Sequence, residues 1–153
     1  MVHLREMPEH LRDNLVNQEV PTFESTPWAE GPPLSERRVA LISTAGLHRR
    51  EDPPFTPGAG DYRIIPDDAD MDALVMSHVS TNFDRTGYFK DYNVVFPIDR
   101  LRELESEGKI GSIAARHFSF MGATPPHVME PIARDLAGIL KQDKVDAVVF
   151  CPV

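Results

Sequence analysis

From Asn93 to the last residue, short apolar runs alternate with amphipathic segments, and this alternation restricts the fold more than any other feature of the sequence. The apolar runs are NVVFP, KIGSIAARHFSF and VDAVVF. Between them, IDRLRELESEG and PHVMEPIARDLAGILKQD carry their apolar residues at helical spacing, and Gly108 is a natural helix end. Strand, helix, strand, helix, strand in this order is typical of βαβ units with a largely parallel sheet.

The residues before Asn93 fit the same architecture. Residues 39–43 form a continuous apolar run, as expected for a strand covered on both faces, and residues 61–66 predict a second, shorter strand. The segment DADMDALVMSHV is compatible with either a short helix or a strand. We therefore expect an α/β domain over residues 39–153, with a mainly parallel sheet flanked by helices in a Rossmann-like, three-layer arrangement.

Residues 1–38 predict a helix and a proline-rich arm. Residues 8–20 can form one amphipathic helix, with Leu11 and Leu15 on a common face. The prolines that follow exclude a regular helix or a central strand. This proline-rich segment is either a linker or, given the interleaved Phe23 and Trp28, an extended arm that lies on the body of the domain.

Charge and composition exclude several classes of partner. The formal net charge of −8 over 153 residues argues against nucleic acid or an anionic membrane as the main partner. No apolar run approaches the roughly 20 residues of a membrane-spanning helix, and the charged start is unlike a secretory signal. The single cysteine excludes an internal disulfide and fits a reducing compartment, so we expect a cytoplasmic protein.

The loop after the first strand is the first candidate site. Thr44 and Gly46 break the apolar run of residues 39–43, and His48 follows two residues later. One glycine makes neither a dinucleotide fingerprint nor a phosphate-binding loop, so no nucleotide cofactor is expected. Strand ends open onto the crevice of such sheets, where this loop could present backbone N–H groups and His48 to an anion. The alternative is a solvated loop histidine.

The polar stretch around His78 and Asp84 is the second candidate. A long polar segment inside a compact domain is often a functional loop, although on composition alone an ordinary surface loop is slightly favoured. No histidine or cysteine spacing supports a metal site. His117 lies near the C-terminal end of a probable strand and is either a satisfied core residue or a participant in chemistry. Cys151 ends the last strand, and a cysteine there is inert unless its surroundings stabilise a thiolate.

Several stretches together resemble the substrate-specific selenoprotein B subunits of the glycine, sarcosine, betaine and D-proline reductases, most of all the D-proline reductase type. They occur in family order from residue 39 to residue 150, and the most distinctive is NVVFPIDRLRELESEGKI. The others are VALISTAGLH, GDYRIIP, VMSHVSTNFD, FSFMGA and VDAVVF.

The resemblance implies an oxidoreductase that reductively cleaves a C–N bond in a small amino acid or betaine. In that family the strand like VDAVVF runs into a selenocysteine-x-x-cysteine redox motif, which places selenocysteine at the position after Val153. A selenol ionises at neutral pH far more readily than a thiol with a pKa of about 8.5. The family also implies a pyruvoyl-bearing partner subunit and a dithiol or thioredoxin-like electron donor.

The resemblance and the strand ends together define the candidate site. The expected catalytic residues are Cys151, His48, His78 and His117. The expected substrate-binding residues are Ser43, Thr44, Gly46 and Asp84. No cofactor or metal is expected among these residues. A non-catalytic binding or assembly module of the same fold is the alternative function.

The likeness to the family runs up to the residue before its selenocysteine. We therefore expect the codon after Val153 to be UGA, with the domain incomplete at its C-terminus. The last strand would then be central or nearly so, with one face thinly covered and Cys151 at an open edge. The competing explanation is a short natural chain that covers its apolar edge as a homodimer.

Overall fold

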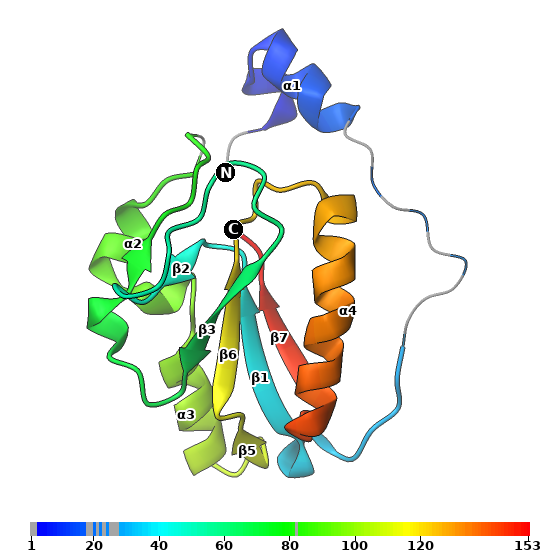
Figure 1. The fold of residues 1–153 in the computed structure, drawn as a ribbon, viewed down its shortest axis with the longest axis vertical. Helices are drawn as coiled ribbons and strands as arrows, with labels where there is room; N and C mark the ends of the chain where they lie inside the picture. Colours follow the sequence, from blue (N-terminus) through cyan, green and yellow to red (C-terminus); the bar gives the residue numbers. More distant parts are fainter. Residues whose placement is uncertain (1–2, 18–19, 21, 23, 25–27, 82) are drawn as a thin grey trace.

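The apolar run predicted as the first strand forms β1 (Arg38–Ser43), the centre of the sheet in this computed structural model, and all but its first residue are buried (Figure 1). β7 (Ala147–Cys151) pairs in parallel along one edge of β1. Along the other edge, β5 (Ser112–Ile113) pairs with the start of β1 and β6 (Arg116–Phe120) with its end. β3 (Tyr62–Pro66) lies outside β6 and runs antiparallel to it. The sheet is therefore mixed.

The structure describes the chain except residues 1–2, 18–19, 21, 23, 25–27 and 82. Within this part the α/β class is confirmed, but the mainly parallel, Rossmann-like three-layer arrangement is not. The pairs around β1 are parallel as expected, whereas the direction of β3 departs from the expectation. The chain passes from β1 through β2 (Leu47–His48) to β3 without a helix that could return it to the other end of the sheet, so β3 runs back against the direction of β1 and β6.

Two predicted strands differ in the structure. The run NVVFP is not a strand: its start belongs to the 3-10 turn η4 (Tyr92–Val94), where the Asp91 carboxylate accepts the N–H of Asn93. The long run KIGSIAARHFSF is divided into β5 and β6, with a break at residues 114–115. The ambiguous segment after β3 contains both the 3-10 turn η3 (Met71–Ala73) and the short strand β4 (Val75–Met76).

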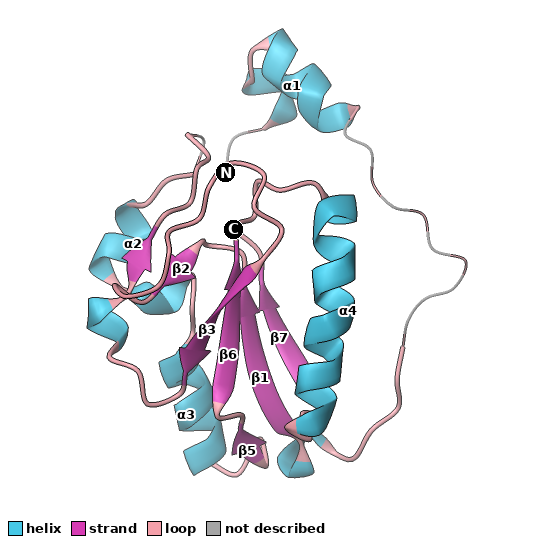
Figure 2. Ribbon diagram, viewed as in Figure 1, coloured by secondary structure: helices cyan, strands magenta, loops and turns pink. Residues whose placement is uncertain are grey.

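The two long predicted helices are confirmed, and they cover opposite faces of the sheet (Figure 2). α3 (Ile98–Ser106) buries Ile98 and Leu101 in the larger core cluster. It is followed by Gly108 with a φ of +68°, the left-handed conformation that favours glycine after a helix. α4 (Pro126–Gln142) covers the other face, where the second cluster contains Ile42, Phe118, Phe120 and Leu136.

The N-terminal helix is shorter than predicted and buries little. α1 (Glu9–Val16) is preceded by the 3-10 turn η1 (Leu4–Glu6). Leu11 is half-buried and Leu15 is exposed, so the predicted apolar face is covered only in part. In the proline-rich arm Trp28 is 80% exposed, which contradicts packing of this side chain on the domain. Phe23 lies outside the described residues.

A second, two-stranded ribbon lies beside the main sheet. β2 and β4 pair antiparallel, with Leu47 opposite Met76 and His48 opposite Val75. The polar stretch after this ribbon contains the short helix α2 (Thr86–Lys90). The remaining 3-10 turn, η2 (Leu34–Glu36), lies directly before β1 in the chain.

The last strand is not central within the described part of the chain, because β7 pairs with β1 alone. The expectation of a central last strand is therefore wrong for this structure. Phe150 is 70% exposed and Val149 is 37% exposed on this edge strand. The face toward α4 is covered in part by the packing of Val148.

Candidate functional site

The carboxyl ends of β1 and β7 bring four of the predicted site residues together. The backbone N–H of Thr44 donates to the carbonyl of Cys151 at 3.1 Å, and the Thr44 hydroxyl accepts the N–H of Val153 at 2.9 Å. Ser43 is fully buried, and its hydroxyl donates to the carbonyl of Val95 at 2.7 Å. Gly46 completes the turn that follows β1, with a φ of +66°.

Cys151 presents an unactivated thiol at this edge. Its side chain is half-buried against the larger core cluster, and its Sγ lies 4.0 Å from the carbonyl oxygen of Val94. Burial raises the pKa of the Cys151 thiol above its ordinary value because the thiolate loses hydration. Near neutral pH Cys151 is therefore a thiol.

His78 is held directly against the turn after β1. A Cβ on Gly46 would lie 2.9 Å from the backbone nitrogen of His78, so only glycine allows this approach. The Nδ1 of His78 accepts the N–H of Ser80 at 3.2 Å, while its buried Nε2 has no hydrogen-bond partner among the described residues. Burial, together with the positive charge of Arg85, lowers the pKa of His78. The imidazole is thus neutral near pH 7.

Arg85, which the sequence did not single out as a site residue, holds the loop that carries His78. Its guanidinium donates to the carbonyls of His78, at 2.5 Å, and Ser80, at 3.1 Å. The predicted binder Asp84 is exposed and accepts the N–H of Thr86. Hydrogen bonding from the side chain and then the backbone of Thr86 lowers the pKa of the Asp84 carboxyl group. The local role of Asp84 is to shape the loop before α2.

His48 faces a different set of neighbours. Its Nδ1 lies 2.7 Å from the carbonyl oxygen of Arg49, and its buried Nε2 is unpartnered among the described residues. The structure does not bring its ring into contact with the neighbours of His78, which are Ser80, Phe83 and Arg85.

His117 occupies the sheet interior. It is fully buried, and its Nδ1 accepts the N–H of Leu41 at 3.0 Å. Leu41 lies where the pairing partner of β1 changes from β5 to β6. Burial lowers the pKa of His117 to about 4, although the Asp67 carboxylate, 3.8 Å from Nε2, acts in the opposite direction. Desolvation outweighs this contact because 3.8 Å is too long for a hydrogen bond. These contacts are those of a core histidine, the first of the two interpretations of the sequence.

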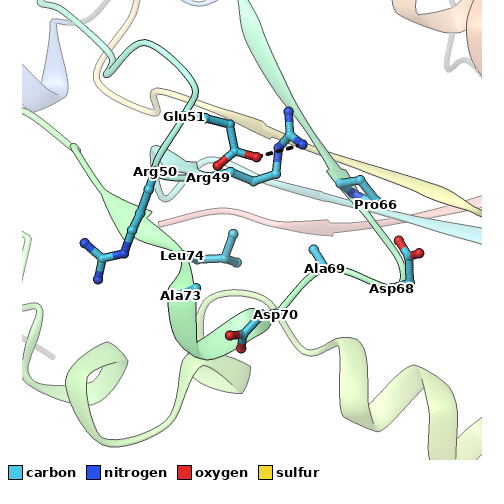
Figure 3. A pocket seen from close by; sticks show the side chains of 9 residues that line it. All are labelled: Arg49, Arg50, Glu51, Pro66, Asp68, Ala69, Asp70, Ala73 and Leu74. Atoms are coloured by element: carbon cyan, nitrogen blue, oxygen red, sulfur yellow. Dashed lines mark ion pairs between the residues drawn. The ribbon is translucent and has the colours of Figure 1, made fainter.

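One described cavity, of about 310 Å³, borders the candidate site, because its lining includes Thr44 and Phe150. Two others have neither Cys151 nor any of the three histidines in their lining. One of about 310 Å³ is lined by Arg49, Arg50, Glu51, Pro66, Asp68, Ala69, Asp70, Ala73 and Leu74. In Figure 3 Arg49 is turned toward the Glu51 carboxylate, 3.0 Å away, whereas Arg50 points away from this ion pair. The only sequence signal for this cavity is the pair of adjacent arginines after β2. A second cavity, of about 420 Å³, contains Arg50 and Tyr88.

The described residues contain no group of three or more His, Cys, Asp or Glu side chains placed to hold a metal ion. None of the described helices is both long and apolar enough to cross a membrane.

The chain is thus an α/β protein with a mixed sheet. Its candidate site, a thiol beside a turn that bears a hydroxyl group, lies at the carboxyl ends of two adjacent strands. The profile of the glycine/sarcosine/betaine reductase selenoprotein B family matches residues 13–152. The chain belongs to this family.

Individual relatives agree with this assignment. D-proline reductase subunit gamma of Acetoanaerobium sticklandii is 37% identical over 121 residues, which cover 76% of this chain and 49% of the relative. Glycine reductase complex component B subunit gamma of Symbiobacterium thermophilum is 30% identical over 86% of this chain and 32% of the relative. Betaine reductase complex component B subunit beta of Peptoclostridium acidaminophilum is 30% identical over 76% and 28%.

The matched region therefore spans about half the length of the D-proline reductase subunit and about a third or less of the other two. No solved structure matches the chain.

Proposed function

We propose that this chain is part of a selenoprotein B-type reductase subunit that takes part in the reductive cleavage of a C–N bond in a small amino acid or betaine-like substrate. Family membership and the names of the relatives support the reductase class. The observation that carries the proposal is the position of Cys151 beside Thr44, at the carboxyl ends of two parallel strands. Ligands of open α/β sheets bind outside these ends.

In this proposal Cys151 is the thiol partner of a selenol. Cleavage converts C–N into C–H and N–H bonds, which takes up two electrons and two protons. A selenol and a thiol supply both when they join in a selenium–sulfur bond, and an external dithiol or thioredoxin-like donor then reduces that bond. The raised pKa of Cys151 suits the resolving thiol rather than the attacking group, because the attacking group must be ionised.

The turn after β1 would bind the substrate in this scheme. Thr44 and Gly46 present polar and backbone groups beside Cys151, and His78 packs on Gly46 with a free Nε2–H among the described residues. His48 and Asp84 remain candidates whose described contacts do not reach this turn. A partner subunit of the reductase complex and a cytoplasmic location are parts of the same proposal.

The test uses the full gene product, assayed with a dithiol and its partner subunits for cleavage of glycine, sarcosine, betaine and D-proline. Cys151→Ser is expected to abolish turnover, whereas the matched control Ser106→Ala, at an exposed position on α3, retains it. Full activity of Cys151→Ser would contradict the proposal.

A non-catalytic binding or assembly module is favoured by one observation: the only cysteine is a thiol of raised pKa with no second cysteine to resolve a mixed disulfide. For such a module, alkylation of Cys151 would leave the dithiol-dependent activity of the assembled complex unchanged. Under the reductase proposal, the same alkylation abolishes that activity.

A further inference from the structure

A cavity of about 420 Å³ has no role in the proposed function. Its lining residues come from η3, β4, α2 and η4 and from the segment after β2. None of the site residues predicted from the sequence lines it. Its volume is within the range of pockets that bind small molecules.

Two opposite charges line this cavity without neutralising each other. The guanidinium of Arg50 has no ion-pair or hydrogen-bond partner in the described part of the chain. The neighbouring Arg49, by contrast, pairs with both Glu51 and Asp52, and Figure 3 shows Arg50 pointing away from the first of these pairs. The carboxylate of Asp72 is likewise unpaired among the described residues, so Arg50 and Asp72 lie beyond ion-pair distance of each other.

The other walls of the cavity are aromatic and aliphatic, and two of the rings are held in place. Tyr88 donates its hydroxyl to the carbonyl of Leu74 at 3.0 Å, and Tyr92 donates its hydroxyl to the carboxylate of Asp99 at 2.6 Å. The rings therefore offer a ligand mainly their apolar surface. The hydrogen bond to Asp99 does most to raise the pKa of Tyr92, and burial and the negative charge of Asp72 act in the same direction. Asp72 is thus within electrostatic reach of this ring.

The mouth of the cavity is open, because Phe89 in its lining is 76% exposed. A bound ligand would cover this ring. The floor is apolar and closed, since Met71 and Leu74 are both buried. The cavity therefore combines an apolar interior with two unpaired charges of opposite sign, which is the chemistry of a site for a small dipolar molecule.

We propose that this cavity binds a small amino acid with an apolar side chain. Its carboxylate pairs with Arg50, because a guanidinium accepts a carboxylate through two parallel hydrogen bonds. Its ammonium group lies between Asp72 and the aromatic rings, since both a carboxylate and a π face attract a cation. A ligand with only one charge leaves the opposite charge of the protein unpaired.

The proposed cavity site is separate from the turn after β1, and it does not depend on the reductase chemistry. Its test measures binding without turnover. A failure of this test therefore leaves the proposed function standing, and a failure of the proposed function leaves this test valid.

Isothermal titration calorimetry of the full gene product with three matched probes tests the site. The probes are L-valine, isobutylamine, which is valine without its carboxylate, and 3-methylbutanoate, which is valine without its ammonium group. L-valine is expected to bind at least roughly fivefold more tightly than either analogue. Equal affinities of the three probes, or no binding of L-valine, overturn the proposal. A protein segment that already fills the cavity gives this last result.

Neutral variants of the two charged residues test where the amino acid binds. Arg50→Gln is expected to weaken L-valine at least roughly fivefold and to leave isobutylamine unaffected, because that probe has no carboxylate. Asp72→Asn is expected to weaken L-valine to a similar extent and to leave 3-methylbutanoate unaffected. Both side chains are exposed, so neither change disturbs the core. Arg134→Gln and Asp135→Asn, at exposed positions on α4, are the matched controls. Binding of L-valine that neither cavity variant weakens overturns the proposal.

Discussion

The depressed pKa of His117 makes the stability of the domain depend on pH in a way that can be worked out. In the folded chain burial holds the pKa at about 4, whereas in the unfolded chain it is 6.5. Between these values the unfolded chain binds a proton that the folded chain does not, so acid favours unfolding. The His117 contribution is fully present above pH 6.5 and is lost as pH falls toward 4.

The size of the effect follows from the two pKa values. The loss of unfolding free energy from this single group is about 2 kcal/mol at pH 5 and about 3 kcal/mol at pH 4. No discount for solvent screening applies, since the side chain is fully buried. Urea unfolding at a series of pH values from 7.5 to 4 measures this loss, but other groups also titrate in this range.

His117→Asn isolates the contribution. The Oδ1 of asparagine can replace Nδ1 as the acceptor of the Leu41 N–H, and asparagine does not titrate. The variant loses ring packing and is less stable at every pH, so the test is the difference between the two pH profiles. Wild type is expected to lose about 2 kcal/mol more than the variant between pH 7.5 and pH 5. Parallel profiles would refute the reasoning.

Three further predictions concern the turn after β1. Gly46→Ala is expected to lower the free energy of unfolding in urea by about 2–4 kcal/mol, because of backbone strain and the contact with His78. The control Gly58→Ala, at a φ of +76° with open space around it, is expected to lower it by about 1 kcal/mol. Equal losses in the two variants would contradict the close approach of His78 to Gly46. Ser43→Ala is expected to lower the free energy of unfolding by about 1–3 kcal/mol, because it leaves the buried carbonyl of Val95 without its hydrogen-bond donor. An unchanged midpoint of urea unfolding would contradict this prediction. Iodoacetamide is expected to alkylate Cys151 more slowly at pH 8 in the folded chain than in urea, and a faster reaction in the folded chain would indicate a thiolate.

The elements that could be predicted from the sequence are those with a local cause. The apolar run of β1 and the helical spacing of α3 and α4 depend on side chains a few residues apart, and the end of α3 depends on one glycine. The direction of β3 has no such cause within its own residues, because a five-residue strand can pair in either direction. The break between β5 and β6 depends on His117, whose ring supplies the acceptor for Leu41 from a distant part of the chain.

The candidate site was predictable to the same extent. Strand ends in a parallel pair meet at one edge, so the proximity of Thr44 and Cys151 follows from the pattern of the strands alone. The positions of the histidines do not, since a histidine in a polar loop and one in a core look alike in sequence. Arg85 was missed because its partners are backbone carbonyls, which leave no mark on the sequence.

The hydrogen bonds of His48 and His78 make the Nε2 atom an acceptor in one imidazole and a donor in the other. The Nδ1 of His48 faces the carbonyl of Arg49, which can only accept, so this nitrogen carries the proton and Nε2 is an acceptor. The Nδ1 of His78 accepts the N–H of Ser80, so its proton lies on Nε2, a donor. Burial lowers the pKa of His78, which makes a protonated imidazole at neutral pH an unfavourable basis for proton transfer. The buried Nε2 of His78 therefore carries a neutral N–H, a donor without a charge for which the described residues supply no acceptor.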